Sequence, residues 1–214
     1  MARQAVVILV VVVAFGILVP LYKGVGFLDS RIVFSYACLA LLFVAPASAE
    51  LAAAHGKSGS PEAAILGRIA LIVAWGWGIT VVILVTAIVT LNLVARGEGL
   101  LAPPLGFLGA VLTFSLSASI AIAVVGAVLT RRFSATAVKN ILRIGFLVIL
   151  LALIFGSRVF PEWVQLEVFD QFSTRRALTR LAWESSIVCG VIAALLLIPL
   201  LWDSRKTESG RSTH

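Results

Sequence analysis

Residues 65–94 read ILGRIALIVAWGWGITVVILVTAIVTLNLV, and Arg68 is the only charged residue among them. A helix rises about 1.5 Å per residue, so ~20 apolar residues cross the ~30 Å hydrocarbon core of a bilayer. Strict apolar–polar alternation, which a membrane-spanning strand needs, is absent from this stretch. The sequence therefore predicts a transmembrane helix here.

Five further segments have the same apolar character. They are Gln4–Tyr22, Ile32–Ser48, Leu105–Thr130, Ile141–Phe155 and Ile187–Trp202. The apolar run at 4–22 is longer than the core of a secretory signal peptide, so we interpret it as a retained first span. The sequence thus predicts an all-α membrane protein with six transmembrane helices.

The composition supports this fold class. The chain is 61% hydrophobic and 13% charged, whereas soluble domains are roughly 45–50% apolar and about 25% charged. Six spans of ~20 residues use more than half of the 214 residues, which leaves no room for a soluble catalytic domain. We predict a single six-helix transmembrane domain over residues 1–202 and a disordered polar cytoplasmic tail over residues 203–214.

The basic residues favour a cytoplasmic position for both termini. Lys and Arg gather on the cytoplasmic side of membrane proteins, and this orientation puts ten of them inside and seven outside. The strongest indication is the group Arg131, Arg132, Lys139 and Arg143 between the fourth and fifth spans. The net charge of +7 is therefore explained by orientation and anionic lipid, and no nucleic-acid partner is predicted.

The sequence lacks the residues that several kinds of chemistry require. His55 and His214 lie outside the predicted spans, and Cys38 and Cys189 have no nearby cysteine, so we predict no haem, metal or other cofactor. There is no GxxxxGK[ST] phosphate-binding loop, so the chain is not expected to hydrolyse ATP itself. No carboxylate lies at the centre of a predicted span, which argues against an ion-coupled carrier or an intramembrane aspartyl protease. We predict no catalytic residue.

Small residues recur on one face of the fourth span. Ser115, Ser119, Ala123 and Gly126 follow one another at spacings of three and four, which places them on the same side of a helix. Small residues allow two helices to approach closely, and hydroxyl groups bond to neighbouring backbone. We interpret this face as a helix-packing surface inside the chain, with a dimer or substrate-path face as the alternative.

The connection between the second and third spans ends in a helix-start pattern. A Ser at the cap, a Pro at the first position and a Glu in the first turn are typical of a helix N-terminus. The residues are Ser60, Pro61 and Glu62, followed by Ala63–Leu66, Gly67 and Arg68. A cytoplasmic turn that leads into a helix suits the docking of a soluble partner, although a plain capped helix start has the same pattern.

The segment Gly156–Glu184 is the longest predicted connection. Aromatic and aliphatic residues alternate there with Glu162, Glu167 and Asp170, which is typical of an amphipathic interfacial or partly re-entrant piece. Its second part, Ser173–Trp183, carries three arginines. We predict an amphipathic outer segment between spans five and six.

Taken together, the Ser60–Arg68 ending, the small-residue helix Ser115–Arg132 with its basic turn, and the 156–184 segment resemble permease subunits of ABC-2-type transporters. The chain departs from that family in its short Glu50–Gly59 stretch. The resemblance implies a non-enzymatic exporter permease in a bacterial inner membrane. Its partners would be a separate nucleotide-binding ATPase and a second permease, identical or related. The implied coupling residues are Ser60, Pro61, Glu62, Gly67 and Arg68.

Other functions are open on the sequence alone. A haem-exporter-like subunit is a narrower variant of the exporter. A non-transporting structural or assembly subunit of a larger membrane complex fits the lack of a polar midplane site. An enzyme acting on lipid, with Arg175, Arg176 and Arg180 as a phosphate site, is the third reading, but the chain offers no obvious nucleophile or base for it.

Overall fold

All the regular elements of the described part of the chain are helices, and that part contains no strand. A computed structural model describes residues 2–34, 36–38, 40–41, 61–95, 100–134, 136–138, 140–142, 144–145, 148 and 171–209. The elements are α1 (Ala2–Lys23), the 3-10 helix η1 (Gly24–Leu28), α3 (Pro61–Val94), α4 (Leu105–Leu129) and α6 (Gln171–Ser209). The predicted all-helical class is therefore confirmed for these residues.

Three helices in the described residues are long and apolar enough to cross a membrane. They are Ile65–Val94, Leu105–Leu129 and Arg175–Trp202, which coincide with the third, fourth and sixth predicted spans. They indicate an integral membrane protein. Over the first predicted span lies α1, with 22 residues, whereas much of the second and fifth predicted spans falls outside the described residues. The count of six spans therefore stays a prediction.

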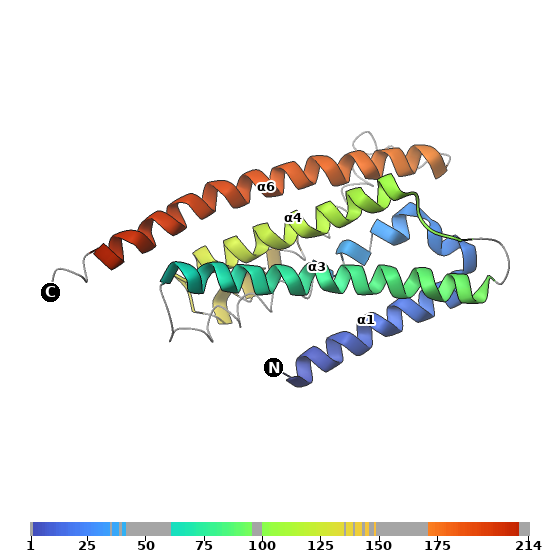
Figure 1. The fold of residues 1–214 in the computed structure, drawn as a ribbon, viewed down its shortest axis with the longest axis horizontal. Helices are drawn as coiled ribbons and strands as arrows, with labels where there is room; N and C mark the ends of the chain where they lie inside the picture. Colours follow the sequence, from blue (N-terminus) through green and yellow to red (C-terminus); the bar gives the residue numbers. More distant parts are fainter. Residues whose placement is uncertain are drawn as a thin grey trace.

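The helices form a bundle in which α3 and α4 pack antiparallel (Figure 1). α1 and α3 run in one direction, and α4 and α6 run in the opposite direction. In packing order, α3 lies against α1 and α4, and α4 lies against α6. As a result the start of α3 and the ends of α4 and α6 share one end of the bundle. The start of α6 and η1 lie toward the other end.

A buried pair of hydroxyl groups joins α3 to α4. Thr80 Oγ1 and Ser115 Oγ are 2.6 Å apart, and both side chains are fully buried. Thr80 also donates a hydrogen bond to the Gly76 carbonyl at 3.2 Å. Because a buried hydroxyl without a partner is costly, the two side chains satisfy each other where no water is present. Buried apolar residues of α3 and α4 form one core cluster with Val33, Tyr36, Ala37 and Ala40.

The contact between α1 and α3 depends on a glycine. A Cβ atom placed on Gly16 would lie 3.0 Å from Thr86 Cβ and 3.4 Å from the Ile83 carbonyl oxygen. This is tighter than ordinary van der Waals contact, so the two backbones approach more closely than a larger residue allows. Small residues at such crossings are the usual means of packing helices in lipid.

The α3–α4 connection is fastened by Asn92. Its Nδ2 donates to the carbonyls of Ile88 and Leu101, and its Oδ1 accepts from the Leu101 N–H, each at 2.8 Å. Leu101 belongs to the non-helical residues 100–104 that precede α4. The side chain therefore satisfies both backbone groups of a loop residue that has no helical partner.

The structure corrects the predicted outer segment. Residues 171–184 do not form a separate amphipathic piece, because they continue without a break into the last span as part of the 39-residue α6. No Gly or Pro interrupts this stretch, and the exposed Arg180–Glu184 pair at spacing i,i+4 supports the helix. Residues 156–170 lie outside the described part. At its other end, α6 continues to Ser209, so the first residues of the predicted polar tail are helical.

We predict that Asn92→Leu lowers the free energy of unfolding by about 1–3 kcal/mol, because it leaves the N–H and C=O of Leu101 without their partner. Asn92→Asp should destabilise the protein similarly, since its carboxylate would face the two carbonyl oxygens to which Nδ2 now donates hydrogen bonds. Thermal unfolding in detergent followed by circular dichroism measures the effect.

Thr90→Val is the matched control, because the Thr90 hydroxyl bonds only to the Thr86 carbonyl of its own helix. It should stay within about 0.5 kcal/mol of wild type. Equal stability of the Asn92→Leu protein and the control would contradict the role given to Asn92.

Candidate functional site

The candidate site lies where α3 begins. Among the described residues α3 begins at Pro61, and because the residues before it lie outside the described part, the helix start predicted from Ser60, Pro61 and Glu62 stays a prediction. Proline suits the first helical position because its φ angle is already helical and the missing N–H has no partner there in any case. Ser60 lies outside the described residues, and for Pro61 and Glu62 the structure describes the helix position.

Two neighbouring residues of this helix differ in their surroundings. Gly67 is exposed, and a Cβ atom added to it would meet nothing within 4 Å. Arg68, the next residue, is partly buried, and the Nε atom of its guanidinium is shielded from solvent. Successive residues of an α-helix point about 100° apart, so Gly67 faces the surface while Arg68 turns toward the bundle.

Arg68 lines a cavity of about 240 Å³ between α3 and α4. The cavity joins residues from two of the predicted sets, because Arg68 belongs to the predicted coupling segment and Ala123 to the small-residue face. Its lining consists of Ile65, Arg68, Ile69 and Ile72 from α3, and Ala123, Ala127, Thr130 and Arg131 from α4 and the turn that follows it. It thus has two guanidinium groups among mostly apolar side chains.

The second arginine of the cavity also holds α6. Arg131 Nη2 donates a hydrogen bond to the Leu200 carbonyl oxygen at 2.9 Å. Arg131 lies just beyond the C-terminal end of α4, where a positive charge also interacts favourably with the helix dipole. Arg68 and Arg131 therefore place positive charge where the ends of three helices come together.

The small-residue face of α4 is covered within the chain. Ser115, Ser119, Ala123 and Gly126 are all buried among the described residues. Ser115 meets Thr80 of α3, as described above, and Ser119 Oγ donates to the Ser115 carbonyl at 2.7 Å. Ala123 belongs to an apolar cluster shared by α3, α4 and α6. These contacts use the face for packing between helices of one chain.

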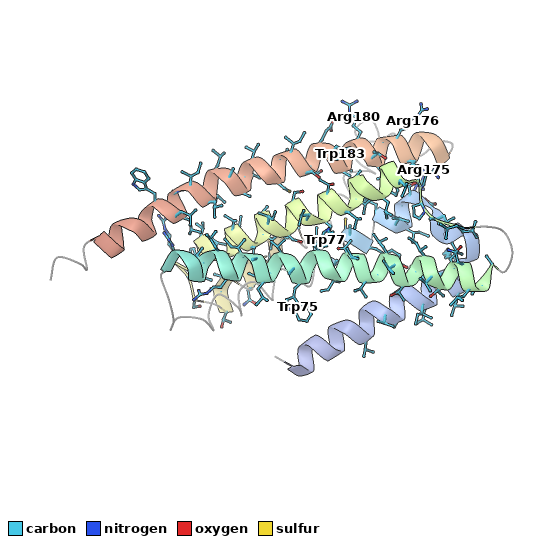
Figure 2. All side chains as sticks on the ribbon, in the orientation of Figure 1. Trp75, Trp77, Arg175, Arg176, Arg180 and Trp183 are labelled. Carbon is cyan, nitrogen blue, oxygen red and sulfur yellow. The ribbon has the colours of Figure 1, made fainter. Side chains whose placement is uncertain are left out.

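The three arginines at the start of α6 do not converge. Arg175 Nε donates to the hydroxyl of the buried Ser30 at 3.3 Å, so this side chain ties α6 to the residues after η1. Arg180 pairs with Glu184 at 2.6 Å on the exposed side. Figure 2 shows Arg176 and Arg180 extending from one side of α6 and Arg175 from the other. The structure therefore does not assemble a three-arginine phosphate site.

Sequence reasoning missed three of these contacts. Asn92 is a single polar residue near the end of an apolar run. That position was the one sequence signal for its contact with the connection that follows. The bond from Arg131 to Leu200 joins residues 69 positions apart, and the bond from Arg175 to Ser30 joins residues 145 apart. A pattern of neighbouring residues cannot predict a contact between residues so far apart in the sequence.

No protein-family model, no curated protein and no solved structure matches this chain. The fold and the site therefore carry the functional argument. The described residues indicate a helical integral membrane protein, in which Arg68 and Arg131 line one cavity. They contain no group of three or more His, Cys, Asp or Glu side chains placed to hold a metal ion.

We predict that Ser115→Leu lowers the free energy of unfolding by about 1–3 kcal/mol, because the larger side chain has no room against Thr80. Gly109→Leu is the matched control on the same helix, since Gly109 is exposed and a Cβ atom there meets nothing within 4 Å. Thermal unfolding of both variants in detergent checks this. Equal melting temperatures would contradict the packing described for α4.

Proposed function

We propose that this chain is the membrane-spanning permease subunit of an ABC-2-type exporter, and that a separate nucleotide-binding ATPase docks where α3 begins. The observation that carries the proposal is the continuity of α3 from Pro61 to Val94. From there α3 continues as a single helix of 34 residues, which is about 50 Å long. A force applied to its first turn is therefore transmitted along the whole helix.

The contacts at this end of the bundle support transmission of movement. α3 packs on α4 along its length, and Arg131 links the end of α4 to Leu200 of α6. Packed helices respond to a displaced neighbour by small sliding shifts. A shift of α3 driven by an ATPase would therefore reach α4 and α6. The chain supplies no phosphate-binding loop of its own, so ATP hydrolysis is assigned to the partner.

The charge at this end supports a cytoplasmic orientation. The start of α3 and the ends of α4 and α6 bring Arg68, Arg131, Arg132, Arg205 and Lys206 to the same end of the bundle. Basic residues next to transmembrane helices favour the cytoplasmic side. In this orientation the docking region faces the compartment that holds ATP. A second permease, identical or related, completes the proposed transporter in a bacterial inner membrane.

One observation favours the alternative, a structural or assembly subunit of a larger membrane complex. Only 17% of the apolar window of α6 is buried, against 44% in α4. A row of large apolar side chains faces outward along α6: Ile187, Val188, Val191, Ile192, Leu195, Ile198 and Trp202. Such a face is suited to lipid and equally to the helices of partner subunits.

We expect purification from native membranes in mild detergent to recover a nucleotide-binding ATPase with the chain. Glu62→Arg should reduce the recovered ATPase at least about tenfold, because reversing a charge at the centre of an interface removes roughly 1.4 kcal/mol or more. Quantitative mass spectrometry of the purified complex measures both.

Glu184→Arg is the control, because Glu184 lies in the first part of α6, toward the opposite end of the bundle. This variant should retain the ATPase. If the wild-type chain carries no nucleotide-binding subunit and instead purifies with components of another membrane complex, the exporter proposal is wrong and the assembly subunit takes its place.

A further inference from the structure

The cavity between α3 and α4 has a charged end and an apolar end. Arg68 and Arg131 lie toward the end of the bundle, whereas Ile72 and Ala123 lie deeper along their helices. Ile72 is four residues beyond Arg68, which is about 6 Å along the axis, and Ala123 is seven residues before Thr130, which is about 10 Å. Apart from Ile65, which lies three residues before Arg68, the lining therefore changes from cationic to apolar over the depth of one lipid headgroup region.

The charged end is selective for anions. Its two guanidinium groups come from α3 and from the turn after α4, and none of the eight lining residues described is acidic. Arg68 is partly buried, and an anion beside a partly buried charge interacts with it more strongly than at an open surface. Guanidinium groups suit phosphate in particular, because their N–H donors match its oxygen geometry.

The apolar end favours an anion that carries a hydrocarbon chain. Ile69, Ile72 and Ala123 offer hydrocarbon surface to a chain that continues inward from the phosphate. The volume of about 240 Å³ lies below the ~300 Å³ at which sites for whole drug-sized molecules begin. The cavity therefore has room for a headgroup phosphate and the first methylene groups, with the remaining chains lying along the outside of the bundle.

We propose that this cavity binds the phosphate group of an anionic phospholipid. Arg68 and Arg131 contact the phosphate, and the isoleucines of α3 contact the beginning of an acyl chain. Basic pockets between transmembrane helices are known places for anionic headgroups. Because Arg131 also holds Leu200, a lipid bound here links α3, α4 and α6. This inference stands on the cavity alone and does not depend on the exporter proposal.

The test is native mass spectrometry of the full chain released from an uncharged detergent. The probes are phosphatidylglycerol, phosphatidylcholine and inorganic phosphate. We expect wild type to bind phosphatidylglycerol at least about tenfold more tightly than phosphatidylcholine. Arg68→Gln and Arg131→Gln should each weaken phosphatidylglycerol binding about tenfold, which corresponds to the loss of one charge-assisted contact, and should weaken phosphatidylcholine binding less, because the choline cation of that lipid offsets its phosphate charge.

Arg132→Gln is the matched control, because Arg132 neighbours Arg131 and is exposed as Arg131 is, but does not line the cavity. If this variant loses phosphatidylglycerol as strongly as Arg131→Gln does, the effect comes from general surface charge and the proposal is overturned. Equal affinity of wild type for the two lipids also overturns it. Binding of inorganic phosphate as tight as that of phosphatidylglycerol would overturn the assignment to a lipid and indicate a free anion.

A second pair of variants covers a failure of the glutamine proteins to fold. Arg68→Lys and Arg131→Lys keep the positive charge and lose the planar fork of donors. Weaker phosphatidylglycerol binding in these proteins supports the cavity as the site. Unchanged binding of both lipids would contradict it.

Discussion

The absence of water inside a bilayer is the constraint on which the rest of this structure depends. Every backbone N–H and C=O in the hydrocarbon region must find its partner inside the protein. Helices do so locally, and all the regular elements of the described residues are helices. The same constraint governs the side chains. The hydroxyl groups of Thr90, Thr113 and Ser186 each donate a hydrogen bond to the carbonyl four residues earlier in the same helix.

Once helices form, apolar side chains no longer drive their association, since lipid is as apolar as they are. Close approach and polar contacts must do so instead. Gly16 lets α1 approach Thr86, and Ser115 meets Thr80 across α3 and α4. Asn92 fixes the turn that brings α4 back along α3. These few small or polar residues determine which faces of otherwise uniform helices meet.

Helix formation is local, whereas the contacts between helices depend on the fold. This difference explains what the sequence could predict. The end of α3 and the bounds of α4 followed from apolar runs, because this signal is local. The continuous α6 was missed because an amphipathic stretch next to a span has the same pattern whether it lies on the membrane or extends the helix. The spacing of Ser115 and Ser119 predicted a face but not its partner. The contact of Arg131 with Leu200 depends on the fold, so the cavity it lines was not foreseeable.

The proposed docking of an ATPase requires the start of α3 to face the cytoplasm and the start of α6 to face the other side. Thiol labelling tests this most directly, in a chain whose Cys38 and Cys189 are replaced by alanine. Gly67→Cys and Arg176→Cys each alter an exposed position, and intact cells are treated with a membrane-impermeant maleimide. The Arg176→Cys protein should react in intact cells, and the Gly67→Cys protein only after permeabilisation. Labelling of the Gly67→Cys protein in intact cells would contradict the proposed orientation and the docking site with it.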